Sequence, residues 1–273
     1  MTLLLIGKGR WSEKVSNSIQ SGLPKLPTKV VGAREFLTDV SSYDLESIEY
    51  VWITSQPALQ LEILKSLESF TGKILIEKPI GLSSTDFNYL KDSIHTQRDN
   101  LRLSKVWNYS AIWLKLKSFL QSNLTHIEIT RGGPNHNSSI PLHIDWLPHD
   151  VFLLTDLFGE SMLRFKKISR IIKDELLKAE IQIADKDIVV NLCTGKLKEG
   201  RVAEWRFFSG SKLLLTADFS KGEIILENGE SVIPKLNQDA ISGMVLDIPL
   251  INRESVQRDI RVQERFGKLL LGM

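Results

Sequence analysis

The sequence is poor in cysteine, in net charge and in long apolar runs. Cys193 is the only cysteine among 273 residues, which excludes an intrachain disulfide framework and favours a reducing, cytoplasmic location. A net charge of +2 is too mild to indicate nucleic-acid binding. The apolar residues 3–6 are too few for a signal-peptide core or a membrane span, and no later run is long enough. We therefore expect neither nucleic acid nor a membrane among its partners.

The composition indicates a globular chain with a sizeable core. Hydrophobic residues make up 42% of the sequence and charged residues 25%, and both values are typical of globular domains. A length of 273 residues suits one large domain or two medium ones. The last strand predicted for the first half ends at Trp107, and the hydrophobic pattern changes from Leu124 onward, so we expect two domains, 1–107 and 108–273.

The chain begins with a strand, a glycine turn and a helix. Residues 3–6 are consecutive aliphatics, typical of a buried parallel strand, and an amphipathic helix follows to about Gly22. The turn between them is Gly7-Lys8-Gly9-Arg10-Trp11-Ser12. Gly7 permits the tight turn, Gly9 lets backbone amides approach a pyrophosphate, and Ser12 is small enough to keep helix and strand close. The turn predicts a dinucleotide site, with a strand-turn-helix that binds no ligand as the alternative.

The second predicted strand, residues 28–33, bears on the type of dinucleotide. An acidic residue about 20 positions past the glycines usually binds the adenosine ribose of NAD. This chain has Gly32-Ala33-Arg34 there. A guanidinium suits a 2′-phosphate, so Arg34 favours NADP over NAD, unless it is a solvated loop charge.

A buried strand that ends in a lysine is the most informative stretch of the first half. Three aliphatic residues, 74–76, are followed by Glu77, Lys78 and Pro79. The carboxyl ends of parallel strands border the ligand crevice, so Lys78 is expected to face the ligand. Pro79 keeps Lys78 extended, and the bond between them could be cis. The alternative is that Glu77 and Lys78 are ordinary charges at a strand end.

The rest of the first half alternates strands and helices. Further strands are predicted over residues 48–54 and 101–107, with helices from Pro57 to about Phe70 and from Ser83 to about His95. This order predicts a doubly wound parallel sheet.

The second half reads as a mostly antiparallel sheet with few helices. Alternating apolar residues predict strands over 125–131, 163–172, 179–184, 188–193, 202–208, 212–218 and 223–226. A helix is predicted from about Pro148 to Phe158, with Pro148 in its first turn, and a long amphipathic helix over 252–271.

On these motifs the chain resembles the glucose-fructose oxidoreductase, inositol dehydrogenase and rhizopine-catabolism family (Gfo/Idh/MocA). Residues 55–79 look like the turn, helix, GK and EKP sequence of that family, with Gly72-Lys73 and Glu77-Lys78-Pro79 matching. Gln60 stands where many members have histidine. The resemblance covers essentially the whole chain. It implies a Rossmann dinucleotide-binding domain at 1–107 and an open-sheet α+β domain for substrate binding and oligomerisation at 108–273.

The second family signature is an aspartate followed four residues later by a histidine. Asp145-Trp146-Leu147-Pro148-His149-Asp150 matches it. Residues four apart on a helix share a face, so Asp145 and His149 are expected to point the same way. Taken alone, Asp145 could be a helix cap and His149 a satisfied interface histidine. A metal is a further alternative because His136 and His143 are close in sequence, but the spacing matches no metal motif, and we expect none.

The resemblance implies an NAD(P)-dependent oxidoreductase acting on a sugar, polyol or sugar-derived substrate as a homodimer or higher homo-oligomer. Lys78, His149 and Asp145 are the expected catalytic residues. The expected cofactor-binding residues are Gly7, Gly9, Arg10, Trp11, Ser12, Arg34, Thr54, Ser55, Gln56, Glu77 and Lys78. The alternatives are a non-catalytic nucleotide-binding regulatory module, an imine or bile-pigment reductase of the same family, and a metal-dependent hydrolase. A polar loop, residues 135–139, is a candidate to meet substrate hydroxyls or a plain surface loop.

Overall fold

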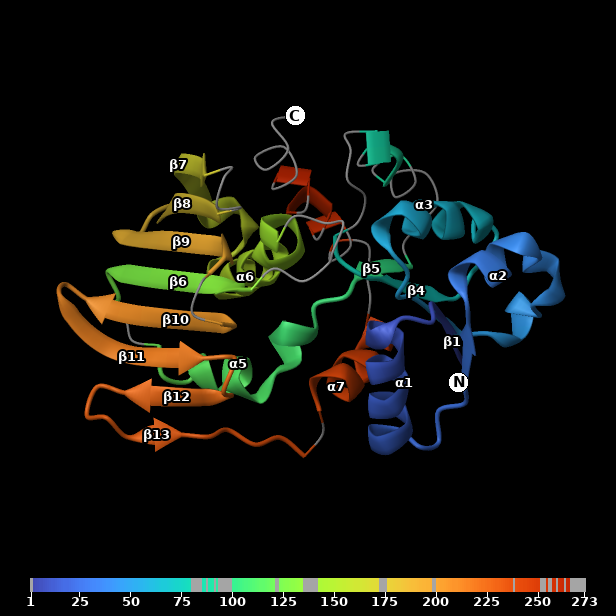
Figure 1. Cartoon of the computed structure of the whole chain (residues 1–273), viewed down its shortest axis with the longest axis horizontal. Helices are drawn as coiled ribbons and strands as arrows, with labels where there is room; N and C mark the ends of the chain where they lie inside the picture. Colours follow the sequence, from blue (N-terminus) through green and yellow to red (C-terminus); the bar gives the residue numbers. More distant parts are fainter. Residues whose placement is uncertain are drawn as a thin grey trace. The chain divides into compact units, whose positions relative to one another are not determined.

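The computed structural model divides the chain into two compact units (Figure 1). It describes residues 2–79, 85–86, 88–90, 92, 100–120, 123–134, 142–171, 176–197, 200–237, 239–250, 254, 257–258, 260–262 and 264–265. The first unit comprises Met1–Val106 with Gln238–Met273, and the second comprises Trp107–Asn237. Each unit is built around its own sheet.

The sheet of the first unit has five parallel strands in the order β2-β1-β3-β4-β5. The strands are β1 (Leu3–Ile6), β2 (Thr28–Val31), β3 (Tyr50–Ile53), β4 (Lys73–Ile76) and β5 (Leu101–Leu103). Every residue of β1 and β3 is buried, as aliphatic and aromatic runs in a parallel sheet should be. The predicted doubly wound parallel sheet is therefore confirmed, and its strand order reverses between β1 and β3.

Helices cover both faces of this sheet. They are α1 (Arg10–Gly22), α2 (Ala33–Thr38), α3 (Pro57–Ser66) and α7 (Ala240–Leu246). α1 and α7 pack together, as do α2 and α3, and the two pairs lie on opposite faces (Figure 1). β2 ends at Val31, two residues earlier than predicted, because α2 begins at Ala33. Most of the helix predicted over 83–95 lies outside the described residues.

The predicted division at residue 107 assigns the segment from residue 238 onward to the second domain. In the structure this segment clusters with the first unit instead. α7, which the sequence analysis did not predict, packs so closely on α1 that a Cβ on Gly22 would collide with the Ser242 side chain. The Met244 sulfur accepts a hydrogen bond from the backbone N–H of Lys105 at 3.3 Å. Contacts of α7 with both α1 and the chain after β5 thus anchor this segment. The described residues of the helix predicted over 252–271 are helical.

The second unit contains an eight-stranded sheet in the order β13-β12-β11-β10-β6-β9-β8-β7. The strands are β6 (His126–Gly133), β7 (Leu163–Ile171), β8 (Leu176–Ile183), β9 (Ile188–Lys196), β10 (Val202–Ser209), β11 (Lys212–Asp218), β12 (Glu223–Leu226) and β13 (Ser231–Val232). β6 and β9 pair in parallel and the other neighbours are antiparallel. The predicted mostly antiparallel sheet is confirmed, and β13 is an addition to it.

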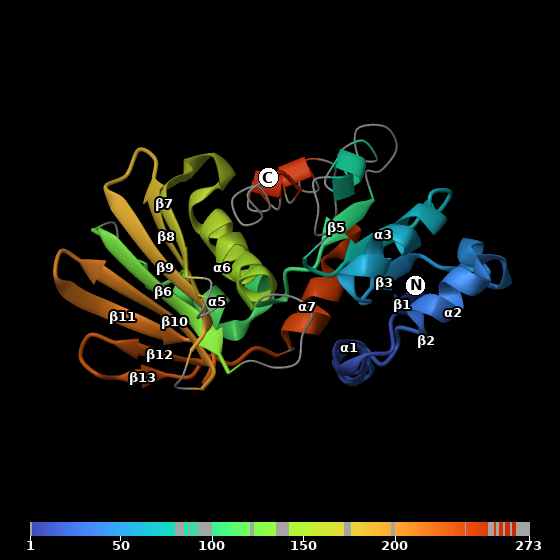
Figure 2. The ribbon, with the colours of Figure 1, turned by 45° about the horizontal axis from the view of Figure 1, so that its top comes forward.

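Two helices pack on one face of this sheet, α5 (Ala111–Leu116) and α6 (Leu142–Phe158) (Figure 2). α5 was not predicted. α6 starts at Leu142, so Pro148 lies inside the helix and the prediction that places it in the first turn is wrong. Pro148 is buried and its neighbour Leu147 is only 3% exposed, so apolar packing on the sheet maintains the helix through the residue that lacks an N–H.

Within the described ranges, no helix combines the length and apolar character needed to cross a bilayer.

Asp239 connects α7 to α1 within the first unit, and this contact gives a testable prediction. Its carboxylate caps α7 by accepting from the N–H of Ile241 at 2.9 Å and of Ser242 at 3.2 Å, and it also accepts from the Ser18 hydroxyl. Burial alone would raise the pKa of Asp239, but the hydrogen bonds from Ser18 and Ser242 outweigh it and lower the pKa. Asp239→Ala should reduce the free energy of unfolding at neutral pH by about 1 kcal/mol.

The same carboxylate should give this loss a pH dependence. A lowered folded-state pKa contributes stability that is present above the unfolded-state pKa and is lost as pH falls through the folded-state value. Urea unfolding at neutral pH and at about pH 3 should therefore show the gap between wild type and Asp239→Ala shrinking in acid. Asp239→Asn, which keeps the cap without the charge, should unfold with little pH dependence of its own at this site. An equal gap at both pH values would contradict this assignment.

Candidate functional site

The glycine turn and the chain after β3 emerge next to each other, at the carboxyl ends of paired strands. Ile6 aligns with Ile53, and the N–H of Thr54 donates to the carbonyl of Ile6 at 2.9 Å. Gly7 follows Ile6 with a φ of +149°. A Cβ on Gly7 would lie 2.5 Å from the Thr54 hydroxyl and 2.7 Å from the Ser12 hydroxyl. Only glycine fits here, because both the backbone conformation and the space exclude a side chain.

A chain of two hydroxyls connects α1 to the sheet beneath Gly7. Thr54 Oγ1 donates to the carbonyl of Ile6 at 3.2 Å, so its single proton is used. The Ser12 hydroxyl, 2.6 Å from Thr54 Oγ1, is therefore the donor of that pair. Ser12 is 1% exposed. Its hydroxyl thus does more than keep helix and strand close, because it bonds the helix to the end of β3.

Gly9, unlike the tightly packed Gly7, borders open space. It is the N-cap of α1, and among the described residues no atom lies within 4 Å of the place where its Cβ would be. No side chain caps this helix end, so the first-turn amides of Arg10, Trp11 and Ser12 have no side-chain acceptor there. An exposed, uncapped helix N-terminus behind an unobstructed glycine fits a pyrophosphate group.

The chain after β2 brings a carboxylate beside the glycine turn. Lys8 Nζ lies 2.7 Å from Glu35 Oε2, which also accepts from the Gly32 N–H at 3.2 Å. Hydrogen bonds from Lys8 and from Gly32 hold the pKa of the exposed Glu35 carboxyl below its usual value. Arg34, the second residue of α2, is exposed. This edge therefore carries two cationic side chains, Lys8 and Arg34, and one carboxylate that is bound to Lys8.

The chain after β3 is fixed by a buried amide. Gln60, only 1% exposed, donates from Nε2 to the carbonyl of Ser55 at 3.1 Å. Gln56 is the exposed N-cap of α3, with Pro57 as the first helical residue. Gln60 thus positions the backbone between Thr54 and α3.

Glu77 and Lys78 follow β4 and differ in their surroundings. Glu77 is 7% exposed and accepts a hydrogen bond from Trp52 Nε1 at 3.0 Å. Burial raises the pKa of the Glu77 carboxyl, against the lowering effects of a hydrogen bond from Ser104 and of the Lys78 charge. Lys78 is half-buried, and the Lys78–Pro79 peptide bond is cis. The Glu77 side chain is thus buried within the first unit, while Lys78 is partly accessible.

In the second unit, Asp145 and His149 lie on α6 as predicted. Both are half-buried, and their four-residue spacing places them on one face of the helix. The His149 ring meets the Trp107 ring at an edge-on angle of 68°, with 5.9 Å between centroids. Trp107 belongs to a 3-10 turn, Val106–Tyr109, and not to the predicted strand 101–107, because β5 ends at Leu103.

The residue after His149 forms a buried ion pair to which the sequence analysis assigned no role. Asp150 is fully buried and accepts from Arg131 Nε at 2.7 Å and from Arg131 Nη2 at 2.8 Å. Trp205 Nε1 adds a third hydrogen bond at 2.8 Å. The alternation of apolar residues along β6 could have indicated this buried ion pair. Ile127 and Ile129 are buried, so Arg131 occupies the next inward-facing position, where a charge needs a partner.

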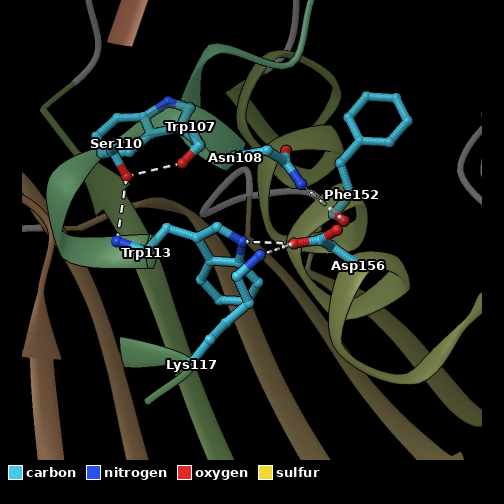
Figure 3. A network of polar contacts seen from close by, with 7 residues as sticks. All are labelled: Trp107, Asn108, Ser110, Trp113, Lys117, Phe152 and Asp156. Carbon is cyan, nitrogen blue, oxygen red and sulfur yellow. Dashed lines mark hydrogen bonds and ion pairs between the residues drawn. The ribbon is translucent and has the colours of Figure 1, made fainter. Parts of the chain in front are cut away.

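A second network on α6 has similar chemistry at a more exposed position. Asp156 accepts from Trp113 Nε1 at 2.7 Å and from Lys117 Nζ at 3.0 Å (Figure 3). Figure 3 also shows the Ser110 hydroxyl, which donates to the carbonyl of Trp107 at 2.7 Å. Asp150 and Asp156, both on α6, therefore each accept a hydrogen bond from an indole N–H and form an ion pair with a cationic side chain.

Comparison with known proteins gives matches among solved structures alone. No protein-family model and no curated sequence matches the chain. UDP-N-acetylglucosamine 3-dehydrogenase from Acidithiobacillus ferrooxidans aligns with a TM-score of 0.73 and 15% identity over 97% of this chain and 96% of that one. The scyllo-inositol dehydrogenase of Lactobacillus casei gives 0.67 and 16% over 96% and 94%. A mutant 3-ketoreductase from Actinomadura kijaniata, in complex with TDP-benzene and NADP, gives 0.77 and 11% over 100% and 97%.

The chain has the Gfo/Idh/MocA fold. The fold expected from the resemblance is thereby confirmed over nearly the whole chain. The Gfo/Idh/MocA fold places the predicted residues in two groups. Those from Gly7 to Lys78 belong to the first unit, whereas Asp145 and His149 belong to the second.

Some predicted features lie outside the described residues. They are residues 80–83 after the EKP motif and the polar loop 135–139, which includes His136. Within the described part of the chain, no group of three or more His, Cys, Asp and Glu side chains could hold a metal ion.

The two glycines of the turn should respond differently to alanine. Gly7→Ala forces a side chain into a strained conformation against two hydroxyls, so it should lower the free energy of unfolding by about 1–3 kcal/mol. Gly9→Ala enters open space with an ordinary φ of −90°, so it should cost less than about 1 kcal/mol, from the poorer N-cap alone. Urea unfolding of the two variants measures this difference. Equal losses would show that the turn is not packed as described.

Proposed function

We propose that the protein is an NAD(P)-dependent oxidoreductase that transfers hydride between nicotinamide and a carbinol or carbonyl carbon of a sugar, polyol or sugar-derived substrate. One observation carries this proposal. The buried Gly7 and the open Gly9 precede an uncapped helix at the point where strand order reverses, which is where open α/β sheets bind nucleotides. The three similar structures are two dehydrogenases and a ketoreductase, and they support the same chemistry.

The residues of the first unit suit a bound dinucleotide. The first-turn amides from Arg10 to Ser12 would hold the pyrophosphate, and the chain from Thr54 to Gln56 would border it. When bound, the nicotinamide supplies or accepts the hydride. The role of the Ser12 and Thr54 hydroxyls would be to keep α1 at the fixed distance from β3 that their mutual hydrogen bond sets.

The proposed preference is NADP over NAD. Arg34 is exposed at the end of β2, and Lys8 reaches the same edge. A 2′-phosphate would gain charge-assisted hydrogen bonds from such cations. The NADP in the complex of the similar ketoreductase supports this preference.

The proposed catalytic residues are Lys78, His149 and Asp145. Lys78 would hydrogen-bond the reacting oxygen and stabilise its developing negative charge. His149 would accept the proton in oxidation and return it in reduction, because the ordinary pKa of histidine lies near neutrality. Asp145 would orient the imidazole or bind a neighbouring hydroxyl. Glu77, buried against Trp52, would hold the start of the Lys78 segment in place.

The proposed substrate class is a hydroxylated ring. The names of the similar proteins include a UDP-linked amino sugar and an inositol. These support a first screen of nucleotide sugars and inositols with each nicotinamide cofactor.

Lysine and histidine variants test the catalytic assignment. Lys78→Ala and His149→Ala should each still bind NADPH and lose turnover by at least about 100-fold, the range that a positioned proton-transfer group contributes. Lys73→Ala is the matched control, since Lys73 begins the strand after which Lys78 lies, and it should keep full activity. Stopped-flow absorbance of the reduced nicotinamide measures the rate. Turnover at the wild-type rate in either active-residue variant would refute its role.

A homo-oligomer and a cytoplasmic location complete the proposal. The sheet face opposite α6 carries polar residues in cross-strand register, such as the exposed Arg206 and Asn191 and the half-buried Glu128 between them. Mixed charges in rows can pair with a second copy of the same face. Sedimentation equilibrium should give a mass of at least two chains, and a monomer at every concentration would contradict the oligomer. Cell fractionation tests the location.

A further inference from the structure

The Arg131–Asp150 pair lies in the second unit in the immediate vicinity of His149. Arg131 is 4% exposed and Asp150 is fully buried. The two side chains meet through two parallel N–H···O bonds, and Trp205 Nε1 donates a third hydrogen bond to the carboxylate. A pair of this geometry is rigid, because the planar guanidinium and carboxylate can form both bonds in one relative orientation only.

The pair reaches the His149 imidazole through an aromatic ring. The guanidinium carbon of Arg131 is 5.0 Å from the centroid of Trp107, which is within cation–π range. Trp107 in turn presents its ring to His149 at 5.9 Å. Phe219 packs edge-on against Trp107 at 5.6 Å, and Ser110 bonds the Trp107 carbonyl. The indole is therefore held on several sides, with the imidazole against one of them.

Stability alone is a weak reason for such a pair. Apolar residues of similar size often replace a buried ion pair with no loss of stability, because desolvation offsets most of the Coulomb attraction. The direct link from the pair to His149 gives a more specific reason. Asp150 fixes Arg131, Arg131 and Phe219 fix Trp107, and Trp107 packs against the imidazole.

We propose that Arg131 and Asp150 are positioning residues that hold Trp107 against His149 and thereby fix the orientation of the imidazole. The consequence for catalysis rests on the proposed function, in which His149 transfers the proton. The placement of the ring does not depend on that function, so the two can be tested separately.

The test uses a double variant and a matched control on the same helix. Arg131→Met with Asp150→Asn removes both charges, fills similar volume and leaves an amide oxygen to accept the Trp205 N–H. Lys117→Met with Asp156→Asn makes the same exchange in the network of Figure 3, where Asp156 accepts from Trp113. Thermal unfolding verifies that each variant folds. Trp107→Leu removes the ring and keeps the ion pair, so it gives a second route to the same answer should the first double variant not fold.

Two readouts distinguish positioning from general packing. The first is the pair of imidazole C–H signals of His149 in histidine-labelled protein, assigned with His149→Ala among the five histidines of the chain. The second is the division of the kinetic effect between kcat and the NADPH dissociation constant. Misplacement of a proton-transfer group should lower kcat by about 10- to 100-fold without a comparable change in cofactor affinity.

The expected result is that the Arg131/Asp150 double variant shifts the His149 signals and lowers kcat, that Trp107→Leu lowers kcat, and that the Lys117/Asp156 control does neither. Trp107→Leu is judged by kcat, because loss of the indole ring current moves the His149 signals whatever the orientation of the imidazole. Unchanged His149 signals in a folded Arg131/Asp150 variant, or an unchanged kcat in Trp107→Leu when His149→Ala is inactive, would overturn the proposal. Full turnover in His149→Ala would refute the proposed catalytic role of His149, and the signals would still decide whether the pair positions the ring.

Discussion

Parallel pairing of β1 with both β2 and β3 is the constraint on which the first unit depends. Ile6 aligns with Val31 on one side and with Ile53 on the other, so three strands end at the same level. The glycine turn, the Lys8–Glu35 pair and the Thr54 hydroxyl meet at that edge as a result. β1 and β3 are buried along their whole length and leave polar groups only beyond their ends, which concentrates the candidate binding residues there.

The second unit depends on a different condition, the satisfaction of charges inside a core. Arg131 points to the helix-covered side of the sheet, where an unpaired guanidinium would be very costly. Asp150 of α6 meets this need and in doing so fixes the rotation of the helix against β6. His149 and Asp145 belong to the same helix, so their directions follow from that contact. A packing requirement thereby determines how two candidate functional side chains are presented.

Periodicity predicted the main sheets and most strands, because buried parallel strands and half-buried antiparallel strands leave clear patterns in the sequence. It missed the short helices α5 and α7, which span only six and seven residues, too few for a period of 3.6 to be recognised in the sequence. It also misjudged where α6 begins, because it took Pro148 as a boundary. The candidate site residues Gly7, Lys78 and His149 were proposed from motifs. Arg131 was not, because its role depends on Asp150 and Trp205, which are distant in sequence. Contacts between residues distant in sequence depend on tertiary packing, so the local sequence pattern does not predict them.

The central claim is that the glycine turn holds a nicotinamide dinucleotide. The most direct test is a titration of the purified protein with NADPH and with NADH, followed by reduced-nicotinamide fluorescence, with Gly9→Ala as the control that keeps the fold. The account predicts saturable binding of both, tighter for NADPH, and weaker binding of each to Gly9→Ala, because its methyl group lies where the pyrophosphate approaches the amides. Failure of the wild-type protein to bind either cofactor, in reduced or oxidised form, would contradict it.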